Sequence, residues 1–420
     1  MITFRQLNII PCLLILISCL FLTSCDRKGR ITPEELVTGI WRAAIFSQGQ
    51  EIPFLMEIEK TEHGGLAGYL INGEERIRLD TITRTGDSLH IPMHVFDSGI
   101  SARLEGGLLT GFYIRHDVAD YRLPFEARHG IRDRFPLSSV EPEANFNGKW
   151  RTYFISGSDS SMAIGIFRQG GRQIEGTFLT KSGDYRFLSG IVEGNIMQMS
   201  TFDGSFIYLF RARMQNNGII SGEFWSGKSG YRKWVAFRDE DAQLPDPYTL
   251  TGMRYSDEPL GFRFPNPDGQ LIGLDDERYR NKPVVVEIMG TWCPNCMDES
   301  RFLAEWYSNN KGRGVEVIGL AFERKDDFTY GAERIRRSKE KLGIGYEILF
   351  AGSTSEESRR NALPLIEKLA SYPTTIFLDR QHHIVKVHAG FSGPGTGAYY
   401  DEFVAEFEST MDQLIGDRLP

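Results

Sequence analysis

Two cysteines are the residues most able to do chemistry, and they stand in the segment Trp292-Cys293-Pro294-Asn295-Cys296. Before them, residues 283–289 form a short β-branched apolar run, typical of a buried strand. After them, residues 297–309 carry apolar side chains at helical spacing. The thiols therefore fall at a strand-to-helix junction, where they can close into a disulfide and where the helix dipole favours a thiolate at the first sulfur. Such a pair is either redox machinery or half of a metal site.

Two more residues favour the redox interpretation. Glu287 lies six positions before Cys293 inside the apolar strand, where a carboxylate is costly to bury. Pro373 opens another apolar strand about eighty residues downstream of Cys293. In this order, the acid, the Trp-Cys-x-x-Cys motif and the proline resemble the thioredoxin superfamily. The distance from Cys296 to Pro373 resembles its TlpA- and ResA-like branch, and the resemblance covers roughly residues 259–414.

The position of Cys293 at the helix start predicts the attacking thiolate, and Cys296 is expected to be the resolving thiol of a cycling disulfide. Burial is expected to raise the pKa of Glu287, which can then exchange a proton with Cys296 through a water. The resemblance implies a cis Pro373 facing the dithiol. Trp292 is expected either to shield the dithiol or to be a packed aromatic side chain without a role in the chemistry. The function predicted is an extracytoplasmic thiol-disulfide oxidoreductase that reduces substrate protein disulfides without a cofactor.

Alternatives remain for this pair. It can be a structural disulfide or half of a zinc site, although no second Cys-x-x-Cys completes four ligands. His382, His383 and His388 suggest a copper-chaperone-like thiol protein, but such proteins use Cys-x-x-x-Cys, and His382 and His383 are expected in a hairpin turn. The peroxiredoxin pattern Pro-x-x-x-Thr-x-x-Cys is absent around both thiols. A different class is a ligand- or partner-binding lipoprotein whose thioredoxin fold is mainly a scaffold.

The first residues read as an export signal. Arg5 precedes an almost wholly apolar stretch, residues 9–22, and Leu22-Thr23-Ser24-Cys25 resembles a bacterial lipoprotein cleavage site. We therefore expect residues 1–24 to be removed and Cys25 to be lipidated, with an ordinary signal peptide or a membrane-spanning anchor as alternatives. The protein would be anchored in the bacterial cell envelope, facing the periplasm or exterior, with a membrane thiol donor as its reductant. The net charge of −8, with scattered basic residues, gives no indication of nucleic-acid binding.

The elements that position the thiols follow a long β-rich region with an internal repeat. Gly39-Ile40-Trp41-Arg42 recurs as Gly148-Lys149-Trp150-Arg151, an offset of 109 residues. The fold class predicted is multidomain: two antiparallel all-β repeats, each a small barrel or sandwich, followed by an α/β thioredoxin-like domain. The expected ranges are 31–131, 145–240 and 255–418. Trp41 and Trp150 are expected in the cores, and the repeats are expected to be independent of the redox site.

Each repeat offers about eight strands, centred in the first copy near residues 44, 56, 69, 78, 91, 102, 112 and 125. In the C-terminal part the pattern predicts a charged helix near residues 327–342 and a second helix over 357–369. It also predicts a hairpin of residues 374–378 with 384–388. A last helix is expected to bury Phe403, Phe407, Met411 and Leu414 on one face.

Overall fold

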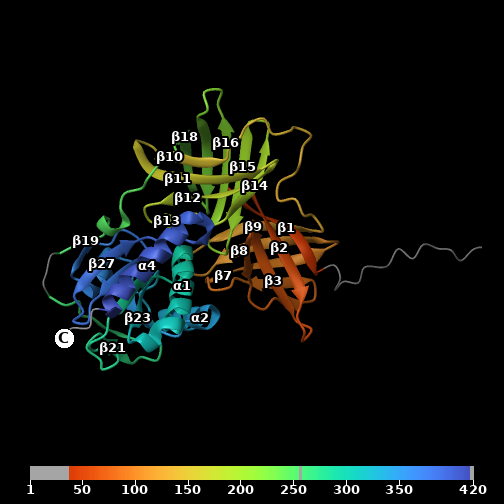
Figure 1. Cartoon of the computed structure of the whole chain (residues 1–420). Coiled ribbons are helices and arrows are strands. Elements are labelled where there is room, and N and C mark those ends of the chain that lie inside the picture. Colours follow the sequence, from red (N-terminus) through yellow and green to blue (C-terminus); the bar gives the residue numbers. More distant parts are fainter. Residues whose placement is uncertain (1–36, 255–257, 417–420) are drawn as a thin grey trace, which may run out of the picture.

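The computed structural model describes residues 37–254 and 258–416 (Figure 1). The predicted signal peptide, residues 1–24, and the lipidation site Cys25 lie outside these ranges, as do residues 31–36 of the first predicted repeat. Within the described ranges, no helix has the length and apolar character needed to cross a membrane.

The first β-unit is an open antiparallel sheet of nine strands, drawn in red and orange in Figure 1. Its strands are β1 (Gly39–Ser47), β2 (Gln50–Lys60), β3 (Leu66–Asn72), β4 (Glu75–Arg78), β5 (Thr83–Thr85), β6 (Ser88–Pro92), β7 (Ser98–Glu105), β8 (Leu108–Arg115) and β9 (Arg122–His129). Their order, β4-β3-β2-β1-β9-β8-β7-β6-β5, is an up-and-down arrangement left open between β4 and β5. All eight predicted strand centres fall in these strands, and β5 is the one strand that the pattern missed.

The second β-unit has the same up-and-down connections but closes. Its strands are β10 (Gly148–Ser156), β11 (Asp159–Gly170), β12 (Gln173–Thr180), β13 (Gly183–Asp184), β14 (Leu188–Glu193), β15 (Ile196–Phe202), β16 (Ile207–Met214), β17 (Ile220–Ser226) and β18 (Gly230–Arg238). Pairing of β11 with β12 joins the two ends of the sheet, so this unit is a barrel and the first is a half-barrel.

The repeated tryptophans occupy equivalent places. The indole N–H of Trp41 donates to the carbonyl of Val37 at 2.9 Å, and that of Trp150 donates to Phe146 at 2.8 Å. Both side chains are buried, which confirms their prediction as core residues. Each ring is also covered from the last strand of its unit, Trp41 by His129 and Trp150 by Arg238. The two repeats therefore share both the buried tryptophan of the first strand and a side chain of the last strand that covers its ring.

The two β-units pack against each other through a common apolar cluster, and the second unit also has a core of its own around Trp150. The apolar cluster of the first β-unit includes Phe202, Leu209 and Trp225 from the second unit. Met297 of the cysteine-bearing helix belongs to the same cluster. Burial of these side chains covers the face that the open sheet would otherwise expose. The sequence predicted repeats independent of the redox site, whereas this cluster includes Met297 of the cysteine-bearing helix.

The C-terminal unit is a mixed five-stranded sheet, ordered β24-β23-β22-β26-β27, with helices around it. Its main elements are β22 (Val284–Met289), α1 (Pro294–Asn310), β23 (Glu316–Glu323), α2 (Phe328–Leu342), β24 (Glu347–Ser353), α3 (Glu356–Ala362), β26 (Thr374–Leu378), β27 (Ile384–Ala389) and α4 (Ala398–Gly416). Short strands β19 (Gly252–Met253), β20 (Arg263–Pro265), β21 (Leu271–Gly273) and β25 (Ile366–Lys368) complete it, with 3-10 turns η1 (Pro247–Thr249), η2 (Lys311–Arg313) and η3 (Pro394–Thr396). Figure 1 shows α1 where this unit meets both β-units.

Most predictions for the C-terminal unit are confirmed. The charged helix is α2, the hairpin is β26 with β27, and α4 buries the four predicted apolar residues. The helix predicted over 357–369 is wrong beyond residue 362, because α3 ends at Ala362. Pro364 disfavours helical geometry at Leu363, which has φ −135° and ψ 74°, and the chain continues as β25.

Candidate active site

The two cysteines lie at the junction of β22 and α1, as predicted. All six residues of β22 are buried in the middle of the sheet, and the chain leaves it through Gly290 and Thr291. Cys293 is the N-cap of α1, and its sulfur accepts a hydrogen bond from the backbone N–H of Cys296 at 3.3 Å. A sulfur in this position faces the unpaired N–H groups and the positive end of the helix dipole. Both cysteines are free thiols; Cys293 is 6% exposed and Cys296 is fully buried.

Pro373 and Trp292 border the first sulfur. The Tyr372–Pro373 peptide bond is cis, as the family resemblance implied. The Cys293 thiol donates to the carbonyl of Tyr372 at 3.6 Å, which places the proline segment against the dithiol. Trp292 donates its indole N–H to the carbonyl of Phe322 at 3.0 Å, and its ring lies edge-on to that of Tyr372 at 5.4 Å. The aromatic side chain is therefore fixed beside the sulfur.

Glu287 lies in β22, fully buried beneath the cysteines. The hydroxyl of Ser300 donates to one of its oxygens at 2.6 Å, and that of Tyr346 donates to the other at 2.8 Å. Burial raises the pKa of this carboxyl to about 7, although both hydrogen bonds favour the charged form and act against the rise. A carboxyl with such a pKa exchanges protons readily near neutral pH.

Glu299 is a second buried acid that the sequence interpretation missed. It is fully buried on α1, and one of its oxygens accepts a hydrogen bond from Thr375 at 2.7 Å while the other has no partner. Burial, and then the charge of Glu287, raise its pKa well above the ordinary value. The sequence does contain a signal, because Glu299 lies three residues after Cys296 and so falls on the same helix face.

Cys296 completes this group of weak acids. Burial is the largest cause that raises the pKa of its thiol well above the ordinary value, followed by its hydrogen bond to Cys293 and the negative charge there. Charge on Glu287 opposes charge on Cys296 and on Glu299 in this low-dielectric site. The arrangement can hold a small number of protons next to an accessible sulfur and pass them between groups.

The second β-unit covers the residues between the cysteines, which the sequence did not predict. The Asn295 side-chain amide donates to the carbonyl of Asp184 at 3.1 Å. The Ser205 hydroxyl lies 3.4 Å from the carbonyl oxygen of Trp292, to which it donates. A Cβ on Gly183 would come within 2.9 Å of Asn295, so these two segments of the chain are in direct contact. The dithiol thus lies at an interface between units.

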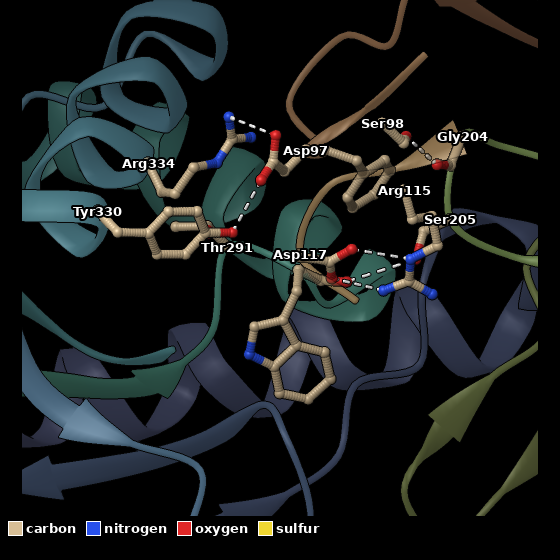
Figure 2. A pocket seen from close by; sticks show the side chains of 11 residues that line it. Asp97, Ser98, Arg115, Asp117, Gly204, Ser205, Thr291, Tyr330 and Arg334 are labelled. Carbon is tan, nitrogen blue, oxygen red and sulfur yellow. Dashed lines mark hydrogen bonds and ion pairs between the residues drawn. The ribbon is translucent and has the colours of Figure 1, made fainter. Parts of the chain in front are cut away.

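The first β-unit contacts the C-terminal unit beside Thr291 and Trp292, in the pocket drawn in Figure 2. Tyr330 and Arg334 of α2 point toward Asp97, with a hydrogen bond of 3.1 Å from the Tyr330 hydroxyl. Asp117 pairs with Arg115 of its own unit and, at 3.2 Å, with Arg324 of the C-terminal unit. The cavity enclosed here has a volume of about 10 Å³, which is room for roughly one water. The contact is therefore closely packed.

Of the histidines considered for copper, two share a turn and the third lies on a strand. His382 and His383 occupy the turn between β26 and β27, as predicted. His388 is buried on β27, with its ring against Tyr248 and Phe403. In the described ranges, no group of three or more His, Cys, Asp or Glu side chains is arranged to hold a metal ion.

Several known proteins are similar to the C-terminal part of this chain. Residues 257–387 match the model of the AhpC/TSA family. The thiol-disulfide oxidoreductase ResA of Halalkalibacterium halodurans is 25% identical over 154 residues, 37% of this chain and 75% of the relative. The thiol:disulfide interchange protein DsbE of Pasteurella multocida is 30% identical over 111 residues, 26% of this chain and 52% of the relative. The solved thiol-disulfide oxidoreductase from Bacteroides fragilis covers 34% of this chain and 96% of its own, at 22% identity and a TM-score of 0.25.

The C-terminal part of the chain is therefore a thioredoxin-like domain of the AhpC/TSA type. Its relatives place it in the general class of thioredoxin-like redox proteins, at modest identity and over this part of the chain alone. The family match begins at residue 257, after both β-units. The chain spans about half the length of the DsbE relative that it matches.

Proposed function

We propose that this protein is an extracytoplasmic, TlpA-like thiol-disulfide oxidoreductase that reduces substrate disulfides through Cys293 and Cys296. The observation that carries the proposal is the position of Cys293. Its sulfur caps α1, contacts the carbonyl of Tyr372 next to Pro373, and is the more exposed of the two thiols. A nucleophilic sulfur needs both access and stabilisation of its thiolate, and Cys296 is too deeply buried to attack a substrate first.

The proposed reaction has two displacement steps. The Cys293 thiolate attacks one sulfur of the substrate disulfide, so that a mixed disulfide forms and a substrate thiolate leaves and takes up a proton. Cys296 then gives its proton to the buried carboxylate of Glu287, through a water, and attacks the Cys293 sulfur. The second substrate thiolate leaves, two electrons have passed to the substrate, and a Cys293–Cys296 disulfide remains. Trp292 shields the reacting sulfur from solvent.

Glu299 is proposed to assist the second step. Its carboxyl is buried, has one oxygen without a hydrogen-bond partner, and is close enough to Glu287 for each charge to oppose the other. A proton that arrives from Cys296 relieves this repulsion, because it neutralises one member of the pair. Thr375 keeps the carboxyl in place by its hydrogen bond of 2.7 Å.

The proposal places the reaction in the bacterial cell envelope. Residues 1–24 would be a lipoprotein signal peptide, Cys25 would carry the lipid anchor, and a membrane thiol donor would re-reduce the Cys293–Cys296 disulfide. The domains proposed are the β-repeats, residues 31–131 and 145–240, and the thioredoxin-like domain, residues 255–418. Relatives named as thiol-disulfide oxidoreductases support the chemistry of the last domain.

Turnover of insulin disulfides or glutathione disulfide tests the proposal. The wild type is expected to reduce them with a dithiol reductant as electron source, and the double variant Cys293→Ser, Cys296→Ser is expected to lose this activity. Equal rates for the two proteins would leave the thioredoxin-like domain as a scaffold for ligand or partner binding by the β-units.

A further inference from the structure

One arginine of the second β-unit joins all three parts of the structure next to the dithiol. Arg186 is 1% exposed and lies in the segment between β13 and β14. Its guanidinium donates to the carboxylates of Glu75 in the first β-unit and Asp298 on α1. It pairs with Asp203 of its own unit at 3.2 Å and donates to the carbonyl of Pro294 at 3.2 Å. A single side chain therefore ties both β-units to the first turns of the cysteine-bearing helix.

The contact among the two β-units and α1 depends on Arg186, because the side chains around it are mostly acidic. The charged side chains that face the guanidinium are Glu75, Asp184, Asp203, Asp298 and Arg301. Arg301 is 40% exposed and reaches Asp298 from the solvent side at 3.7 Å. Without Arg186, buried carboxylates from three parts of the protein would face one another with no buried cation between them. Removing one partner of a buried ion pair is strongly destabilising for the contact that encloses it.

The same contact decides what can reach Cys293. Arg186 holds the segment that includes Gly183 and Asp184, and this segment lies directly on Asn295. The neighbouring turn after β15 places Ser205 on the carbonyl of Trp292. Both sides of the motif are thus covered, and Cys293 keeps only 6% of its surface exposed. A sulfur displacement needs the incoming disulfide in line with the attacking sulfur, which a folded protein cannot achieve under this cover.

We propose that Arg186 is a specificity-determining residue, which holds the second β-unit over the redox site so that Cys293 accepts small or extended substrates and excludes folded proteins. The inference deepens the proposed function and rests on it. While the ion pairs of Arg186 with Glu75, Asp203 and Asp298 are intact, small disulfides and flexible peptide segments reach the sulfur. A folded protein disulfide reaches it only when the segment 183–186 lifts away from Asn295.

Two maleimides of different size test the access part without any turnover assay. N-ethylmaleimide and a maleimide joined by a short linker to a small folded protein share one reactive group, so the rate of the first divided by that of the second at Cys293 reports access and cancels thiolate reactivity. The rates are measured on the full chain by mass spectrometry of the Cys293 peptide. In the wild type this ratio is expected to exceed that of a free cysteine peptide by at least about tenfold, because opening a contact that buried ion pairs hold closed is costly.

Arg186→Ala is expected to lower the ratio toward that of the free peptide, while the rate with the small reagent changes little. Arg213→Ala, an exposed arginine that bonds Asn195 within the barrel, is the matched control and should keep the wild-type ratio. Glu75→Gln is a milder change at the far end of the cluster, and is expected to shift the ratio in the same direction if Arg186→Ala does not fold. A wild-type ratio equal to that of the free peptide would overturn the inference.

The substrate part predicts that Arg186→Ala raises insulin turnover relative to glutathione-disulfide turnover. A wild-type maleimide ratio equal to that of the free peptide, together with no disulfide turnover, would refute both the proposed function and the cover over Cys293. A large maleimide ratio without disulfide turnover would instead support restricted access to Cys293 and refute the proposed oxidoreductase activity. The two failures are therefore distinguishable.

Discussion

Replacing Glu287 with glutamine is expected to change how the stability of the protein depends on pH. Burial raises the pKa of Glu287 from 4.5 to about 7. Between these values the folded protein keeps a proton on this carboxyl that the unfolded chain has released. The free energy of unfolding therefore falls as the pH rises from about 4.5 to about 7, because the folded state then binds more protons than the unfolded state.

The size of this effect follows from the same two values. Each pH unit of difference corresponds to ~1.36 kcal/mol, so ionising Glu287 costs the folded state on the order of 3 kcal/mol at pH 8. Glutamine has nearly the same shape and does not ionise. The hydroxyls of Ser300 and Tyr346, which now donate to the two carboxylate oxygens at 2.6 and 2.8 Å, can donate to the amide oxygen or accept from its NH₂ group. The hydrogen bonds should therefore survive the change.

The assay is urea unfolding of the wild type and Glu287→Gln at pH 5 and pH 8. Relative to the wild type, the variant is expected to gain about 3 kcal/mol between the two pH values. Glu305→Gln, an exposed position on α1, is the matched control and should show no such gain. The same difference between Glu287→Gln and wild type at both pH values would refute the reasoning.

The Glu287→Gln variant should also resolve mixed disulfides more slowly. The ~10²–10⁴-fold contribution that is typical of general acid–base catalysis is the upper bound of this loss in rate.

Two further predictions concern the rest of the chain. Mass spectrometry of the mature protein should find acylated Cys25 at the N-terminus, and a retained Met1 or cleavage elsewhere would contradict lipid anchoring. A fragment of residues 26–240 should give a β-type circular dichroism spectrum, because within the described ranges the apolar cluster common to the β-units loses Met297 and the partly buried Leu342 from the C-terminal unit. An unfolded fragment would show that the C-terminal unit is required for this cluster.

The positions of the thiols could be predicted because their signals are local. A β-branched run, a Cys-x-x-Cys segment and helical spacing follow one another within about twenty-five residues, and each constrains its own backbone. Strand positions in the β-units were predictable for the same reason. The end of α3 was predictable as well, since Pro364 limits the residue before it, but helical spacing beyond the proline misled the prediction.

Contacts between units could not be predicted in this way. Arg186 meets Glu75 and Asp298, which lie 111 and 112 residues away from it, and no periodic pattern links them. Closure of a sheet depends on pairing between strands at or near its two ends. β11 and β12 of the second unit form such a pair, whereas β4 and β5, the end strands of the first unit, do not. The second acid, Glu299, had the right spacing to Cys296, yet its burial depends on β26 packing over α1 through Thr375.

The central claim is that Cys293 attacks the substrate and Cys296 resolves the mixed disulfide. Trapping with glutathione disulfide, which is small enough to reach the covered sulfur, tests it most directly. Cys296→Ser is expected to accumulate a mixed disulfide through Cys293, since the resolving thiol is absent, and Cys293→Ser is expected to accumulate none because Cys296 is fully buried. A mixed disulfide through Cys296 in the Cys293→Ser variant, with none in Cys296→Ser, would contradict the account.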